Sequence, residues 1–141
     1  MRLMIDTNIF LDVLTQREPF YANSKAVLEL CENKKIQGFL SASSVTDIYY
    51  LIHRHLHNAE LAYQALGSIL DIVKVLTVTN DDVLNAYITK APDFEDCLLA
   101  TCAKSNKCDA IVTRNKKDYL TFGITLLSPE ELLELFPVET E

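Results

Sequence analysis

The sequence predicts an α/β fold: a three-layer α/β/α sandwich built on a mostly parallel sheet of four or five strands. Short apolar runs, several of them β-branched, alternate along the chain with longer segments whose apolar residues have helical spacing. Strands that are separated by helical crossovers pair in parallel and carry helices on both faces of the sheet. The chain of 141 residues has the size of one domain, which we expect to span residues 1–141.

The expected strands are apolar and stop at polar residues. The first covers residues 3–5 and ends abruptly at Asp6, Thr7 and Asn8, which all favour turns and helix starts. The others cover residues 36–40, 73–78, 110–112 and 124–127.

The expected helices have apolar residues three and four positions apart, and most begin at a residue that can cap a helix. The clearest spans residues 93–105, where Phe94, Leu98 and Thr101 share one face. The others span residues 8–14, 23–31, 44–56, 58–70, 80–89 and 128–135, and the tail 138–141 is expected to fray.

Composition and charge limit the classes of function. The chain is 49% hydrophobic and 23% charged, which is typical of a globular protein. Its net charge of −7 argues against a large basic clamp for nucleic acid. The charge leaves open an enzyme that holds nucleic acid through metal ions bound to carboxylates.

We expect a cytoplasmic protein with reduced cysteines and no membrane association. The four cysteines form no C-x-x-C pair, which argues against a zinc or thioredoxin-like site. No apolar run approaches the roughly 18 residues of a membrane span. Asp6 and Asp12 interrupt the N-terminal region, so it does not have the pattern of a signal peptide.

Acidic and amide side chains recur where the expected strands give way to helices. Because strand ends and helix starts share one edge of a parallel sheet, we expect these side chains to meet there. Clustered carboxylates repel one another, and a hard divalent cation such as Mg²⁺ or Mn²⁺ would neutralise them. The candidates are Asp6, Asp47, Asp93, Asp96, Asn115 and Asp118.

Several of these acidic residues also have a simpler interpretation. Ser44-x-x-Asp47 and Asp93-x-x-Asp96 have the spacing of a capping box, and acids stabilise helix N-termini in any case. Asp118 has a turn-like context. The favoured interpretation of Asp12, on the first helix, is a solvated acid.

The joint pattern resembles the PIN-domain ribonucleases, including the VapC-like toxins. Residues 4–12, MIDTNIFLD, are similar to the opening motif of that family. Residues 93–103, DFEDCLLATCA, resemble its third motif, an Asp followed by an alanine-rich helix. Residues 111–119, IVTRNKKDY, resemble its fourth motif, which closes the site. The resemblance extends over nearly the whole chain.

The resemblance implies metal-dependent cleavage of RNA, with Mg²⁺ or Mn²⁺ as cofactor and catalytic roles for Asp6, Asp47, Asp96 and Asp118. Asp6 and Asp96 match the metal-binding acids of the family. Asp47 stands where the family usually has Glu, and Asn115 stands where many members have Asp. Asp93 would be a further ligand or only a helix cap.

The resemblance also implies other contacts. Thr7 and Asn8 would hydrogen-bond the substrate phosphate or a metal-bound water. Arg114 and Lys116, with Lys117, would steer the RNA backbone. The implied partners are an antitoxin protein and a second copy of the chain. Tyr49, Tyr50 and Tyr63 would offer aromatic surface for the second copy, and packing in the core is an equally good interpretation of them.

Two alternatives stay open at this point. A PIN-like domain that has lost catalysis would serve as an RNA-binding or partner-binding module. A phosphatase or response-regulator-like protein would also gather aspartates at strand ends, although no second acid lies two residues beyond Asp6 and no obvious Lys follows the last strand.

Overall fold

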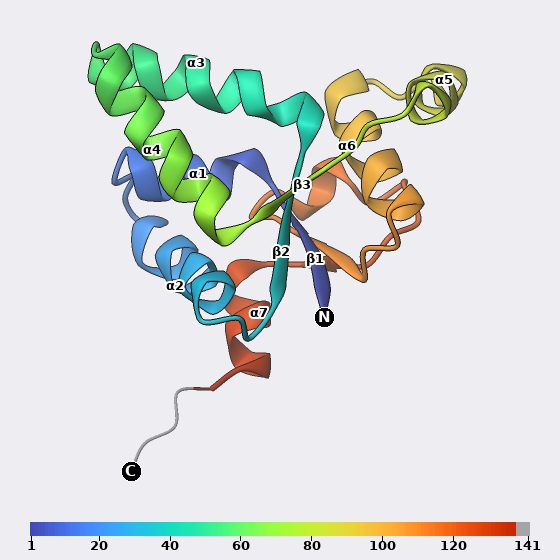
Figure 1. Ribbon diagram of the computed structural model, residues 1–141. Helices are drawn as coiled ribbons and strands as arrows, with labels where there is room; N and C mark the ends of the chain where they lie inside the picture. The colour runs from blue at the N-terminus through green and yellow to red at the C-terminus, as the bar shows by residue number, and fades with distance from the viewer. Residues whose placement is uncertain (138–141) are drawn as a thin grey trace.

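A five-stranded parallel sheet forms the middle layer of the protein in the computed structural model, which describes residues 1–137 (Figure 1). The strand order is β3-β2-β1-β4-β5, and every neighbouring pair is parallel. The predicted fold class is therefore confirmed. The strands are β1 (Arg2–Ile5), β2 (Gln37–Ser41), β3 (Lys74–Leu76), β4 (Ala110–Val112) and β5 (Leu126–Leu127).

The central strand β1 shows how the sheet divides the core in two. Successive residues of a strand point to opposite faces. Leu3 and Ile5 belong to one buried cluster, and Met4, between them, belongs to the other. All three side chains are fully buried, as expected for a central strand covered on both faces.

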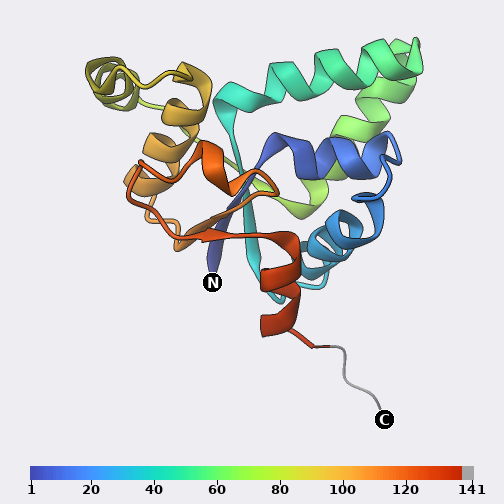
Figure 2. The ribbon, with the colours of Figure 1, turned by 180° about the vertical axis from the view of Figure 1, so that it is seen from behind.

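Helices cover both faces of the sheet (Figures 1 and 2). The larger cluster packs under α1 (Thr7–Leu14), α2 (Tyr21–Glu32), α3 (Val45–Leu56), α4 (Ala59–Ile72) and α7 (Pro129–Leu135). The smaller cluster packs under α6 (Phe94–Ser105), against which α5 (Asn80–Thr89) lies. Two short 3₁₀ turns are η1 (Ala42–Ser44) and η2 (Lys116–Asp118).

The expected and observed elements differ mainly at the edges of the sheet. Strand β3 is shorter than the expected 73–78, and β5 is shorter than the expected 124–127. Both are edge strands with one neighbour each, so fewer of their residues are held by a ladder. The expected fraying of 138–141 lies outside the described residues.

Within residues 1–137, no helix combines the length and the apolar character needed to cross a bilayer. All four cysteines are free thiols, and Cys31, Cys97 and Cys102 are buried.

The carboxyl ends of β1, β2 and β4 lie side by side at one edge of the sheet, because these three strands are parallel neighbours. The backbone N–H of Asp6 continues this pairing past the end of β1 by donating to the Val112 carbonyl at 3.0 Å. The position of Asp6 is thus set by the sheet. Helices α3 and α6 begin near this same edge (Figure 1).

Candidate active site

A cleft of about 340 Å³ opens at the carboxyl edge of the sheet. Its chemistry is acidic: five of the lining residues of the described chain are Asp or Glu, and none is Lys or Arg. The lining residues are Asp6, Thr7, Asn8, Leu11, Asp47, Tyr50, Leu51, Glu95, Asp96, Leu99, Asn115, Asp118 and Tyr119.

Asp6 lines this acidic cleft and is only 6% exposed. The Thr113 hydroxyl, just beyond β4, donates to Asp6 Oδ2 at 2.8 Å and fixes one side of the carboxylate. Burial raises the pKa of Asp6, and hydrogen bonds from Thr113 and Tyr119 partly offset that effect. The charge of Arg114 also lowers the pKa of Asp6, but burial remains the largest effect.

Asp96, in the first turn of α6, faces Asp6 across one hydroxyl group. Tyr119 Oη lies 3.3 Å from Asp6 Oδ1 and 3.2 Å from Asp96 Oδ1, within hydrogen-bond distance of both. Burial and then the charge of Asp93 raise the pKa of Asp96 to about 6, with Asp6 and Asp118 adding to the effect. The acids of the cleft therefore repel one another.

Asp47, in the first turn of α3, meets Glu95 of α6 across the cleft. Burial raises the pKa of Glu95, and the Asp47 charge is the next largest cause. Ser44, which precedes α3, makes no side-chain capping bond, so the capping-box interpretation of Ser44-x-x-Asp47 is not supported. Because Glu95 reaches into the region of the shorter Asp47, the two helices together supply carboxylate oxygens there.

The other predicted residues that line the cleft are Thr7, Asn8, Asn115 and Asp118. Thr7 and Asn8 open α1, directly after Asp6. The backbone N–H of Asn115 donates to Thr113 Oγ1 at 3.0 Å, which ties the loop after β4 to the Asp6 contact. These side chains add hydroxyl, amide and carboxylate oxygens around the acidic pair.

Asp93 does not line the cleft. Its carboxylate accepts a hydrogen bond from the backbone N–H of Asp96 at 3.0 Å and caps α6. Of the two interpretations that the sequence left open for Asp93, the structure supports the cap. Asp93 still acts on the site through its charge, which raises the pKa of both Glu95 and Asp96.

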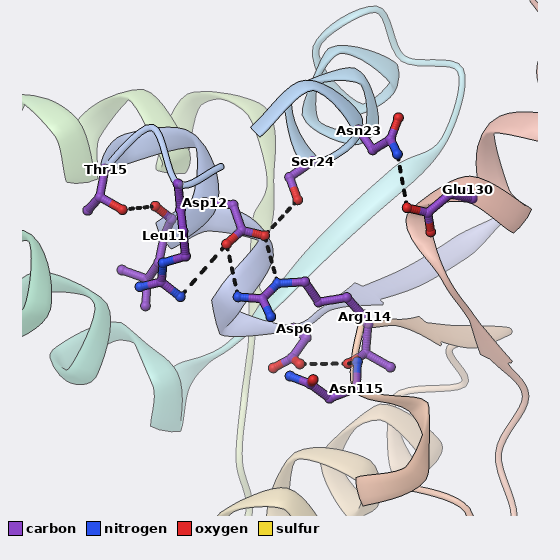
Figure 3. A network of polar contacts seen from close by, with 11 residues as sticks. Asp6, Leu11, Asp12, Thr15, Asn23, Ser24, Arg114, Asn115 and Glu130 are labelled. Atoms are coloured by element: carbon purple, nitrogen blue, oxygen red, sulfur yellow. Dashed lines mark hydrogen bonds and ion pairs between the residues drawn. The ribbon is translucent and has the colours of Figure 1, made fainter. Parts of the chain in front are cut away.

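The interpretation of Asp12 as a solvated acid is wrong, and the ion pair in which Asp12 is buried does not support the role expected for Arg114. Asp12 is fully buried, and Arg114 makes two bonds to its carboxylate, at 3.0 and 3.1 Å (Figure 3). The Ser24 hydroxyl donates to the same carboxylate at 2.9 Å. The Arg114 guanidinium also stacks 3.9 Å from the Phe20 ring centroid. Arg114 is thus an internal partner of Asp12 rather than a group directed at substrate.

Lys116 is also directed away from the cleft. Its ammonium group pairs with Glu131 of α7 at 2.7 Å, and both side chains are substantially exposed. The phosphate-steering role expected for Lys116 is not supported, because its ammonium group is paired with Glu131 and it does not line the cleft.

The donor set of the cleft suits a hard divalent cation. It offers carboxylate, amide and hydroxyl oxygens, which are the ligands that Mg²⁺ and Mn²⁺ prefer. No three acidic, histidine or cysteine side chains in residues 1–137 are grouped tightly enough to coordinate one ion by themselves. An ion here would therefore be held by a few side chains and by water, which is how proteins usually bind Mg²⁺.

Sequence reasoning missed Glu95, Thr113 and Tyr119 as members of the site. Glu95 and Tyr119 lie inside the two motifs, but an acid in a first helical turn and an aromatic residue after a strand have ordinary structural explanations. Thr113 carries a clearer signal in the sequence. It is the polar residue directly after β4, as Asp6 is the polar residue directly after the neighbouring strand β1.

The comparisons with known proteins agree with this architecture. The family model described as "PIN domain" matches residues 2–117. No curated protein matches the chain.

Three solved structures illustrate the likeness. FitAcB from Neisseria gonorrhoeae is 20% identical with a TM-score of 0.69, covering 91% of this chain and 98% of that one. A toxin–antitoxin complex from Klebsiella pneumoniae is 17% identical with a TM-score of 0.66, covering 90% and 97%. VapC20 from Mycobacterium tuberculosis, described as a sarcin-ricin loop cleaving toxin, is 16% identical with a TM-score of 0.61, covering 77% and 86%. At these identities, the likeness shows a common fold.

Proposed function

The chain belongs to the PIN domain family, and we propose that it is a metal-dependent endoribonuclease acting in the cytoplasm as the toxin of a toxin–antitoxin pair. The observation that carries the proposal is the cleft in which Asp6, Asp47, Asp96 and Asp118 meet at the carboxyl edge of the sheet. Two of the compared structures, described as a toxin–antitoxin complex and a sarcin-ricin loop cleaving toxin, support it. Cleavage of a labelled RNA that requires Mn²⁺ and Asp6 tests it.

A bound Mg²⁺ or Mn²⁺ ion would activate a water for attack and stabilise the charge that develops on the phosphate. Asp6 and Asp96, fixed by the sheet and by α6, would hold the ion most directly. Asp47 and Asp118 would complete the negative charge of the site, with Asn115 offering a neutral oxygen. Thr7 and Asn8 at the start of α1 are placed to hydrogen-bond a phosphate oxygen.

The family assignment removes the phosphatase and response-regulator interpretations. The remaining alternative is a PIN domain that binds RNA or a partner without cleaving it. Its sequence basis was Asp47 in place of Glu and Asn115 in place of Asp. Glu95 weakens that argument, because it adds a carboxylate beside Asp47.

We further propose that the protein forms a homodimer and binds an antitoxin. Tyr50 and Tyr63 are 62% and 65% exposed on α3 and α4, two helices that pack against each other, and they offer aromatic surface for a partner. On α5, Tyr87 and Ile88 are exposed as well. Light scattering at tens of micromolar should give the mass of a dimer, and the mass of a monomer would contradict this part of the proposal.

Metal binding should be visible as a change in stability. Millimolar Mg²⁺ or Mn²⁺ should raise the melting temperature, because an ion bound only by the folded state stabilises it, by about 2.7 kcal/mol at one hundred times Kd. Asp6→Asn should remove the rise. Asp71→Asn, which changes an exposed carboxylate at the end of α4, should keep it. Identical melting curves of the wild type with metal and with EDTA would rule out the metal site.

A further inference from the structure

A second hollow adjoins the acidic cleft and has the opposite chemistry. It has a volume of about 510 Å³ and is lined by Leu11, Thr15, Arg17, Leu51, Arg54 and His55. Leu11 and Leu51 line the acidic cleft as well, so the two hollows share a wall. Among the described residues that line this basic groove, none is acidic.

Arg17 keeps a positive charge in the basic groove although it approaches Asp12. Its Nη1 lies 3.8 Å from Asp12 Oδ1, but that carboxylate already holds Arg114 through two shorter bonds. One carboxylate cannot neutralise two guanidinium groups, so the three residues together carry one net positive charge. The Arg17 side chain is 43% exposed, which leaves it accessible to a ligand in the groove.

Arg54 supplies a second cation from α3. Its side chain is exposed, and none of the salt bridges within residues 1–137 involves it. It lies one helical turn after Tyr50 and three residues after Leu51, both of which line the acidic cleft. Helix α3 therefore contributes Tyr50 and Leu51 to the acidic cleft and, one turn later, Arg54 to the basic groove.

We propose that the basic groove binds the phosphate backbone of the RNA strand whose scissile phosphate lies in the acidic cleft. This inference rests on the proposed function and names the surface that holds its substrate. Guanidinium groups bind phosphate in a forked geometry, and phosphate contacts position a nucleic acid without reading its sequence. The groove also accounts for how a chain of net charge −7 holds a polyanion, since Arg114 and Lys116 are paired elsewhere.

Binding of a labelled single-stranded RNA, followed by fluorescence anisotropy in EDTA over a series of salt concentrations, tests the inference. Arg54→Gln should weaken binding several-fold at low salt. It should also reduce the slope of log K against log salt by about 0.7, the contribution of one phosphate contact on a single strand. Arg17→Gln/Arg54→Gln should reduce both further. The control Lys34→Gln/Lys35→Gln removes two exposed positive charges before β2, at the opposite edge of the sheet, and should match the wild type.

Arg54→Gln with the Kd and salt slope of the control would overturn the inference and leave the groove to an acidic protein segment. A second arm measures single-turnover cleavage in Mn²⁺ as protein concentration is varied. We expect Arg54→Gln to raise the half-saturating concentration and leave the maximal rate unchanged. Absence of cleavage by the wild type would contradict the proposed nuclease, whereas the anisotropy result would still decide whether the groove binds RNA.

Discussion

Replacing Asp6 with Asn should lower the single-turnover rate of RNA cleavage by roughly 10³-fold or more, which corresponds to several kcal/mol of transition-state stabilisation. Asp6 is buried, follows a central strand and is fixed by Thr113, so no neighbouring backbone can shift to replace its oxygens. The amide keeps the shape of the side chain but removes the charge that holds a cation. The measurement is cleavage of a labelled RNA with saturating Mn²⁺.

The other acids should follow in an order set by how firmly each is held. Asp96→Asn should match Asp6→Asn, because α6 and the Tyr119 hydroxyl fix its position. Asp47→Asn should lower the cleavage rate less, since Glu95 lies beside Asp47. Asp118→Asn should lower it least, since Asp118 is exposed on a short 3₁₀ turn with Asn115 nearby. Circular dichroism checks that each variant folds, and Asp71→Asn is the control of equal charge change. Equal losses for all four acids would contradict this order.

Replacing Arg114 with Met should lower the free energy of unfolding by about 3 kcal/mol or more, because it leaves the Asp12 carboxylate buried without its main partner. Arg17, at 3.8 Å, and the Ser24 hydroxyl are too weak to replace the two bonds from Arg114. Urea unfolding followed by circular dichroism measures the change.

Two further variants separate this ion pair from a general effect of lost charge. Lys116→Gln breaks the exposed pair with Glu131 and should cost less than about 1 kcal/mol. Asp12→Leu/Arg114→Met removes both buried charges and should recover much of the stability lost in Arg114→Met, because an apolar pair does not require compensation. If Arg114→Met lowers the free energy of unfolding no more than Lys116→Gln does, the internal pairing of Arg114 is contradicted and Arg114 is free to contact substrate.

The parts of the site that could be predicted from sequence are those that the sheet itself brings together. Parallel strands place their carboxyl ends at one edge, so the residues after β1, β2 and β4 must be neighbours whatever the details of packing. Asp6, Asp47 and Asn115 follow directly from that rule. Asp96 required the further inference that α6 begins at the same edge.

The errors concern pairings between residues that lie far apart in the chain. Arg114 and Asp12 are 102 residues apart, and Lys116 and Glu131 are 15 residues apart with β5 between them in the sequence, so neither pair is visible in local patterns. Asp12 did carry a signal. It is the one charged residue in α1, whose residues Ile9, Phe10 and Leu11 are all buried, and a helix that is apolar nearly all round leaves little surface for a solvated acid.

The most direct test of the central claim is cleavage of a labelled RNA by the wild-type protein, first freed of metal with EDTA and then given Mn²⁺. We predict no cleavage in EDTA, cleavage once Mn²⁺ is in excess, and none by Asp6→Asn under either condition. Internal fragments would identify an endonuclease. Cleavage that persists in EDTA, or that Asp6→Asn performs at the wild-type rate, would contradict the assignment of the acidic cleft as a metal-dependent nuclease site.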